Sequence, residues 1–151
     1  MKSIASLVLA AAAITLSAAP ASAQFAKPED AIKYRQSSMS VMGTHFGRVA
    51  AMANGRIPFN AESAASNAAI AESMSKLPWA GFVAGSDAGN TKAKPEIWSD
   101  AAKFKTAQDN MMAEMSKVAL AAKGGNIDAI KAAVGAAGGT CKACHDSFRK
   151  E

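Results

Sequence analysis

The sequence predicts an all-α protein, an antiparallel four-helix bundle, from three observations. Four segments repeat apolar residues at alternating spacings of three and four, which places these residues on one face of a helix. The chain is rich in alanine and poor in β-branched residues, and only 6% of it is aromatic, a composition that favours helices over strands. Proline, glycine and asparagine separate the segments. At 151 residues, half of them hydrophobic, the chain predicts one ordered domain.

The first predicted helix begins at Pro28, because proline is favoured in the first helical turn. Asn54, Gly55 and Pro58 predict its end. Its apolar stripe contains Ile32, Arg35, Met39, Met42, Phe46, Val49 and Ala53. Arg35 is unusual in this stripe, since a buried cation needs a partner unless its side chain reaches water.

The second predicted helix takes Asn60 as its N-cap and ends before Pro78. Alanines supply its apolar side together with Ile70, Met74 and Leu77. A loop rich in Gly, Ser, Asp and Asn follows over residues 77–95 and carries Trp79 and Phe82. Its length predicts a functional role, such as a lid over a buried group.

The third predicted helix begins at Pro95 and Glu96 and ends at Gly124 and Gly125. Its stripe contains Ile97, Ala101, Phe104, Gln108, Met111, Met115, Val118 and Ala122. The fourth begins near Asn126, and its stripe contains Ile127, Ile130, Val134, Ala137, Cys141, Cys144 and Phe148. We expect glycines 135, 138 and 139 to weaken this helix and to let a bulky neighbour approach its backbone. Such seams pack at crossing angles of about 20°.

The first 23 residues have the layout of a secretory signal peptide. Lys2 precedes an apolar stretch from Ile4 to Leu16, and Ala21-Ser22-Ala23 is a typical cleavage sequence. The apolar stretch is shorter than the roughly 20 residues of a transmembrane helix, so a membrane anchor is the less suitable interpretation. We therefore expect cleavage after Ala23, export to the periplasm without a membrane partner, and a bundle formed by residues 24–151.

The charge of the chain excludes one class of partner. The formal net charge is +5, but no run of basic residues is longer than the pair Arg149-Lys150. A nucleic-acid-binding protein needs a clustered basic face. We therefore expect no nucleic-acid partner.

The only two cysteines form the sequence Cys141-Lys142-Ala143-Cys144-His145, the attachment signature of c-type haem. Two thiols three residues apart on one helical turn can form thioethers with the two vinyl groups of one porphyrin. The adjacent imidazole then becomes an axial ligand of the iron. One covalent haem c per chain is the cofactor that this spacing predicts, and a haem propionate would be a partner for Arg35.

Three other interpretations explain the cysteines less well. A thioredoxin-like redox pair would lie at a helix start in a βαβ context. Zinc would need four ligands, and His45 is the only other Cys or His in the chain. A disulfide across two residues would close too small a loop to stabilise much. All three leave His145 without a role.

The residues also resemble a known family, the class II c-type cytochromes called cytochrome c′, especially those of β- and γ-proteobacteria. The resemblance covers essentially all of residues 24–151. The segments that carry it are Gln24–Ala31 with Lys33–Gln36, then His45–Arg48, Leu77–Ala80, Pro95–Asp100, and Cys141–Asp146 with Arg149 and Lys150. Several such segments in order are more specific than the haem motif alone.

The resemblance implies a four-helix bundle that forms a homodimer, mostly through its first two helices. Cys141 and Cys144 would bind the porphyrin and His145 would be the axial iron ligand. The resemblance also places Arg35 and Gln36 near the propionates, Lys94 and Glu96 near the haem edge, and Arg149 in the proximal pocket.

In this family the iron is typically five-coordinate and high-spin, and an apolar side chain from the first helix blocks the distal side. The resemblance gives that position to Met39 here, and Trp79 and Phe82 would complete an apolar distal pocket. Such a pocket would admit NO and CO, while small redox proteins would exchange electrons at the haem edge.

Two other functions remain. A related low-spin carrier of the cytochrome c-556 type would use Met39 as a second axial ligand. An enzyme such as a peroxidase is not expected, because the sequence places no acid–base pair near the inferred pocket.

Overall fold

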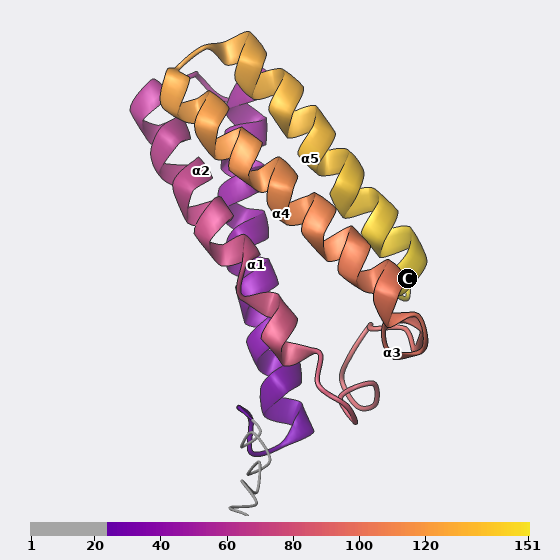
Figure 1. The fold of residues 1–151 in the computed structure, drawn as a ribbon. Coiled ribbons are helices and arrows are strands. Elements are labelled where there is room, and N and C mark those ends of the chain that lie inside the picture. The colour runs from indigo at the N-terminus through magenta and orange to yellow at the C-terminus, as the bar shows by residue number, and fades with distance from the viewer. Residues whose placement is uncertain (1–23) are drawn as a thin grey trace, which may run out of the picture.

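The computed structural model describes residues 24–151, and the predicted signal peptide lies outside the described residues. Four long helices form the bundle: α1 (Pro28–Ala53), α2 (Ala61–Ser75), α4 (Ala101–Gly124) and α5 (Ile127–Phe148). Consecutive long helices run in opposite directions (Figure 1). Around the bundle α1 packs on α2, α2 on α4, α4 on α5, and α5 closes against α1. The predicted antiparallel four-helix bundle is confirmed.

The helix ends follow the local signals of the sequence. Pro28 is in the first turn of α1, and the glycine after Asn54 has a positive φ. The Asn60 side chain accepts a hydrogen bond from the backbone N–H of Ser63 (2.7 Å), and Asn126 caps α5 in the same way. Gly125 ends α4 in the left-handed conformation, which glycine adopts without steric cost.

The prediction of one continuous third helix is wrong, because the helix breaks at Asp100. A short helix, α3 (Glu96–Ser99), comes first, and Asp100 has a non-helical backbone with φ −123° and ψ 57°. Its carboxylate accepts a hydrogen bond from the backbone N–H of Lys103 (3.2 Å) and so caps α4. Aspartate favours such caps over helix interiors, because its side chain competes for backbone donors.

One further expectation about a helix face is corrected. Ile70 and Leu77 are exposed, whereas the predicted alanine side of α2 is confirmed, because the alanines at positions 64, 68 and 71 are buried. Small side chains let α2 lie between α1 and α4. Helix α5 is continuous through its glycines, and within residues 24–151 no neighbouring atom lies within 4 Å of a Cβ built at Gly135, Gly138 or Gly139.

The half of the bundle near the α1–α2 and α4–α5 connections has an aliphatic core. All four long helices contribute to it. We call it the aliphatic cluster: Val49, Met52, Ala53, Ala64, Ala68, Val118, Ala122, Ile130, Val134 and Ala137. Its side chains are small or medium in size, so the helices pack closely here.

The other half of the bundle has two clusters of larger side chains. The methionine cluster consists of Met42, Ala71, Met111 and Met115, with Met39, Phe46, Met74, Trp79, Met112 and Cys141 packed against them. The aromatic cluster consists of Ala93, Ile97, Phe104 and Phe148, with Trp79, Phe82, Trp98, Ala107 and Cys144 packed against them. Trp79 belongs to both clusters and joins them.

A short 3-10 helix, η1 (Pro78–Gly81), follows α2, and an irregular segment then leads to α3. This segment crosses the end of the bundle between the start of α1 and the end of α5 (Figure 1). Ala93 forms an antiparallel bridge with Arg149 there. No helix within residues 24–151 is both long and apolar enough to cross a membrane.

Candidate haem-binding site

The two cysteines lie on the last turns of α5. Both are free thiols and both are half-buried. Cys141 packs against the methionine cluster and Cys144 against the aromatic cluster, so both face the bundle interior. The next residue, His145, is exposed. Two thiols on one face of a helix beside an imidazole are the donor set that covalent haem attachment requires.

The protonation of these groups argues against a reactive dithiol. Burial raises the pKa of both thiols, and the neighbouring Cys141 raises the pKa of Cys144 further. A redox-active pair instead has a lowered pKa at a helix start, whereas these thiols are neutral and lie at a helix end. Burial and the charge of Arg149 lower the pKa of His145, partly opposed by Asp146. The lowered pKa favours the neutral imidazole, the form that ligates a metal.

A zinc site is not supported in the described part of the chain. Residues 24–151 contain no group of three or more Cys, His, Asp or Glu side chains that could hold a metal ion together. His45, the other histidine, instead forms a hydrogen bond between its Nδ1 and Oδ1 of Asn67 on α2 (2.8 Å). This hydrogen bond joins α1 to α2.

The structure brings together the three residues expected to form the distal pocket. Met39 and Trp79 pack against the same methionine cluster as Cys141. The Trp79 and Phe82 rings are stacked with centroids 6.2 Å apart, and the Phe104 ring meets Phe82 edge-on at 4.9 Å. The Trp79 indole N–H donates to the carbonyl oxygen of Ser75 (2.7 Å), which fixes the orientation of the ring.

Arg35 is buried, with only 3% of its surface exposed. Its Nη1 donates to the carbonyl oxygen of Gly81 (2.6 Å) and to Oγ of Ser86 (2.7 Å). Its Nη2 donates to the carbonyl oxygen of Ser86 (2.7 Å) and to Oγ1 of Thr91 (2.8 Å). Protein oxygens therefore supply the hydrogen-bond partners that the buried cation of Arg35 needs. Of the five guanidinium N–H groups, these bonds leave Nε–H as the donor available to a propionate.

The other residues expected around the haem are Gln36 near the propionates, Lys94 and Glu96 at the haem edge, and Arg149 in the proximal pocket. Gln36 Nε2 donates to the carbonyl oxygen of Asn90 (2.9 Å). Lys94 Nζ donates to the carbonyl oxygen of Asp146 (2.9 Å), next to His145. Glu96 is exposed at the start of α3, and Arg149 pairs with Ala93 through the antiparallel bridge.

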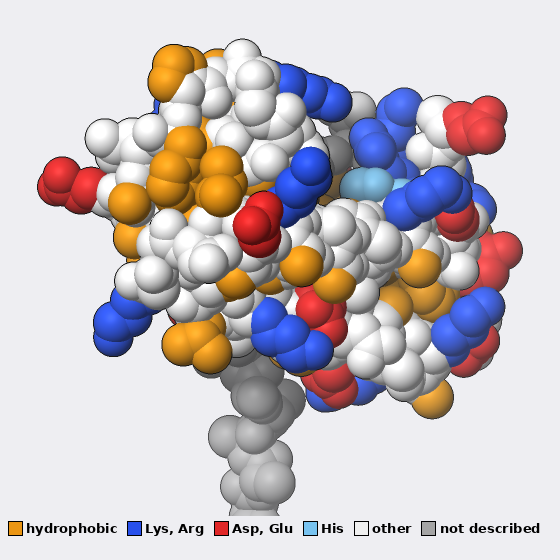
Figure 2. Space-filling model, turned by 90° about the horizontal axis from the view of Figure 1, so that it is seen from above, with side chains coloured by type: hydrophobic (Ala, Val, Ile, Leu, Met, Phe, Trp, Pro, Cys, Tyr) orange, Lys and Arg blue, Asp and Glu red, His pale blue; other side chains and the backbone are white. Residues whose placement is uncertain are grey.

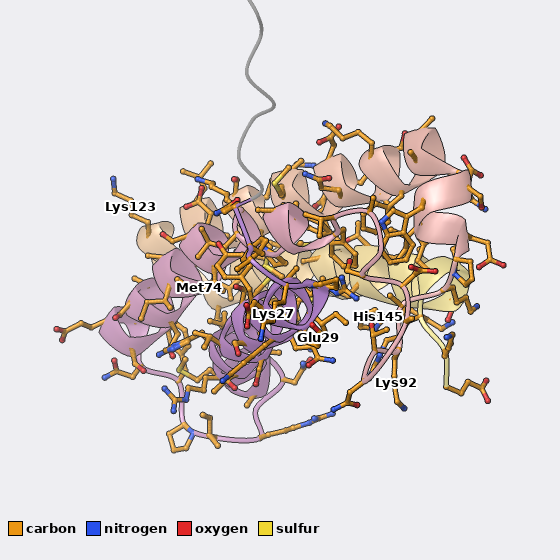
Figure 3. All side chains as sticks on the ribbon, turned by 90° about the horizontal axis from the view of Figure 1, so that it is seen from below. Lys27, Glu29, Met74, Lys92, Lys123 and His145 are labelled. Atoms are coloured by element: carbon orange, nitrogen blue, oxygen red, sulfur yellow. The ribbon has the colours of Figure 1, made fainter. Side chains whose placement is uncertain are left out.

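These contacts bring basic side chains to the region of His145. The backbone N–H of Lys94 donates to the carbonyl oxygen of Phe148, and the backbone N–H of Lys150 donates to the carbonyl oxygen of Lys92 (2.7 Å). Figure 3 places Lys92 and His145 on one side of the molecule and Lys123 on the other. Figure 2 shows a histidine side chain at the surface among Lys and Arg side chains.

The sequence analysis missed three residues that shape the site: Gly81, Ser86 and Thr91. A Cβ at Gly81 would lie 2.6 Å from the carbonyl oxygen of Ala31 and 2.9 Å from Cβ of Arg35, so η1 is pressed onto α1. Ser86 is fully buried. Small hydroxyl residues in a loop give only a weak sequence signal for binding a buried cation, because the partners are 46 to 56 residues away from Arg35 in the sequence.

Comparisons with known proteins agree with this geometry. The family model for cytochrome c′ matches residues 30–149. Cytochrome c′ from Rubrivivax gelatinosus is 53% identical over 129 residues, which are 85% of this chain and all of the relative. The relative from Alcaligenes xylosoxydans xylosoxydans is 46% identical over 128 residues, 85% of this chain and 99% of that protein.

Solved structures give the same result. The crystal structure of Rubrivivax gelatinosus cytochrome c′ superposes with a TM-score of 0.82 over 84% of this chain and 100% of its own. A nitric oxide complex of a mutant from Alcaligenes xylosoxidans has a TM-score of 0.80, at 45% identity, over 85% of this chain and 99% of that one. A carbon monoxide-bound variant from the same organism has a TM-score of 0.79, at 45% identity, over 85% of this chain and 100% of that one.

Proposed function

The chain belongs to the cytochrome c′ family and carries covalently attached haem c; from this premise, we propose that it binds NO and CO at an open distal position and transfers electrons, without being an enzyme. The observation that carries this proposal is that Met39, Trp79 and Cys141 pack against the same methionine cluster, with Phe82 stacked on Trp79. These side chains form an apolar wall next to the attachment turn.

In this proposal Cys141 and Cys144 form the two thioethers and His145 is the axial ligand. Both thiols face the interior, where a porphyrin would contact the methionine and aromatic clusters. The lowered pKa of His145 favours the neutral imidazole, the form that can ligate iron. When bound, haem c supplies an iron that accepts an electron and binds diatomic gases.

The apolar wall selects among ligands by the cost of desolvation. An anion or a strongly hydrogen-bonding molecule loses its water shell on entering such a pocket and gains no polar partner there. NO and CO are neutral and lose little. The nitric oxide and carbon monoxide complexes of the Alcaligenes relative support this choice of ligands. Met39 is half-buried and would block larger molecules without ligating the iron, which would then be five-coordinate and high-spin.

The residues at the mouth of the site complete the proposal. Nε of Arg35 and the side chain of Gln36 would approach the propionates, and Lys94 and Glu96 would lie at the haem edge. Arg149 would lie on the proximal side, where its charge already lowers the pKa of His145. Electrons would pass to small redox proteins at this edge.

Export and dimerisation belong to the same proposal. The layout of residues 1–23 supports secretion to the periplasm. Val41 on α1 and Ile70 on α2 are exposed, and Ile57 and Phe59 between these helices are exposed as well. These side chains support a homodimer through α1 and α2.

A second candidate function is a low-spin electron carrier of the cytochrome c-556 type. The observation that favours it is the thioether of Met39, which packs on the same cluster as Cys141. A thioether can be an axial iron ligand. Six-coordination would close the site to CO and keep the geometry fixed during redox change.

Optical spectra of the ferric and ferrous holoprotein, with and without CO, separate the two functions. The proposal predicts high-spin spectra and a shift on adding CO. The variant Met39→Leu should keep both, and Met52→Leu, in the aliphatic cluster, is the matched control. A low-spin spectrum with a methionine-to-iron charge-transfer band, lost in Met39→Leu but not in Met52→Leu, would establish the electron carrier instead.

A further inference from the structure

A buried cation joins α1 to the irregular segment beside the haem site. Arg35 is 3% exposed, and burial lowers its pKa from the ordinary value, but a guanidinium remains protonated at neutral pH. A buried charge is tolerated only when its donors are satisfied. Every partner of its two terminal nitrogens lies between residues 81 and 91.

The partners of Arg35 are themselves held by the segment. Ser86 Oγ, which accepts from Arg35, donates its own proton to the carbonyl oxygen of Val83 (2.7 Å). Thr91 Oγ1 also accepts from the backbone N–H of Ala93 (3.1 Å). The guanidinium thus ties together two turns, at residues 83–86 and 91–93. One planar group with fixed donor directions specifies the shape of both turns.

The same guanidinium lies over an aromatic side chain that is expected in the distal pocket. Its central carbon lies 4.6 Å from the centre of the Phe82 ring and 5.9 Å from that of Trp98. Phe82 in turn stacks on Trp79. The Trp98 indole N–H donates to the carbonyl oxygens of Phe82 and Val83 (3.2 Å each), which holds this turn from the other side. A cation over an aromatic face is stabilising, more so when water is excluded.

Close packing supports this arrangement. At Gly81 there is no room for a side chain between η1 and α1, so its carbonyl oxygen comes within 2.6 Å of Nη1 of Arg35. The aromatic wall of the pocket and the first helix therefore meet at Arg35.

We propose that Arg35 is a positioning residue for the distal pocket: its bonds to residues 81–91 fix Phe82 and Trp79 and thereby restrict ligand entry. This role rests in part on the proposed function, because the pocket is the one assigned to NO and CO. It differs from the contact with a propionate, which the resemblance implies and which would act through the cofactor.

The test is a double-mutant cycle in the holoprotein with Arg35→Lys and Ser86→Ala. A lysine ammonium cannot make four bonds in a fixed plane, and Ser86→Ala removes a loop acceptor without touching a propionate contact. Arg48→Lys is the matched control, since it makes the same substitution on the same helix at an exposed arginine. The two readouts are hydrogen exchange of amides 81–93 and the rate of CO association.

Both single variants should speed exchange of amides 81–93 and CO association, by roughly tenfold, because the segment opens more often. The double variant should do little more than Arg35→Lys alone, since both changes break one network. The control Arg48→Lys should change neither readout by more than about twofold. If Arg35→Lys fails to fold, Ser86→Ala and Thr91→Val still test the network.

Two results would overturn the proposal. Ser86→Ala could leave both readouts unchanged while Arg35→Lys shifts only the reduction potential, which would assign Arg35 to the propionates alone. Alternatively, the effects of the two variants could simply add. If the wild-type holoprotein does not bind CO, the proposed gas binding fails, but the exchange readout still decides whether Arg35 fixes the segment.

Discussion

The two halves of the bundle are built from different side chains. The half near Asn54 and Asn126 contains the aliphatic cluster, in which alanine, valine and isoleucine fill the space between four closely packed helices. The half with the last turns of α5 contains methionine and aromatic side chains, a buried arginine and an irregular segment. Both cysteines lie in this second half.

This difference separates stability from function within one small domain. Small, rigid side chains pack to a defined density and need no partner beyond the helices themselves. Methionine is flexible and polarizable and adapts to irregular shapes, and the aromatic rings supply large apolar surfaces. The second half is thus suited to surround a large planar group, while the first half holds the helices in register.

The largest expected effect comes from removing the covalent attachment. The double variant Cys141→Ser/Cys144→Ser should lose all covalent haem, because no thioether can form. Amides near the methionine and aromatic clusters should then exchange faster, while those near Val49 and Ile130 keep their protection. Haem staining of denatured protein and hydrogen exchange measure the two effects, with Lys142→Ala as the control. Equal loss of protection in both halves would show that they are not independent.

Truncating a core side chain in the aliphatic half should lower stability and leave the haem properties unchanged. Ile130 is fully buried, so Ile130→Ala should lower the free energy of unfolding by about 2–5 kcal/mol. The haem spectrum and CO binding should not change. Ile127→Ala on the same helix is the control, because Ile127 is 39% exposed and should cost well below that range. Denaturant titration measures both, and a changed spectrum in Ile130→Ala would contradict the separation.

A smaller effect is expected where η1 meets α1, in the functional half. Gly81→Ala places a Cβ 2.6 Å from the carbonyl oxygen of Ala31, so η1 must shift, and overpacking of this kind costs about 1–3 kcal/mol. CO association should also change, unlike in Ile130→Ala. Gly43→Ala in α1 is the control: it meets nothing within 4 Å and should be neutral or slightly stabilising. Equal stability and equal CO association rates in Gly81→Ala and Gly43→Ala would refute the close approach of η1 to α1.

The smallest expected effect is at the N-cap of α5, in the aliphatic half. Asn126 Oδ1 accepts a hydrogen bond from the N–H of Ala129 (3.0 Å), and Asn126→Ala should cost about 1 kcal/mol. CO binding should be unaffected. Asn110→Ala, at an exposed position inside α4, should be neutral or slightly stabilising because alanine is the better helix former. Thermal unfolding of both variants checks this, and an equal loss of stability would exclude the cap as the cause.

Most of the fold was predictable because its signals are local. The spacing of apolar residues, the proline at Pro28 and the caps at Asn60 and Asn126 act within one or two helical turns. The break at Asp100 was missed because its apolar neighbours continue the same spacing on both sides. The exposure of Ile70 and Leu77 was also missed, because alanine gives little contrast between the inside and the outside of a helix.

The candidate site likewise has a part that local sequence signals predict and a part that they do not. The sequence alone determined the bundle and the attachment chemistry, since Cys141, Cys144 and His145 lie within five consecutive residues and the helix geometry fixes their relation. Only the tertiary structure decided what surrounds Arg35. Its partners lie 46 to 56 residues away, in a segment without periodic structure. Hydrogen bonds between such distant residues depend on how the helices pack, and no local pattern encodes that packing.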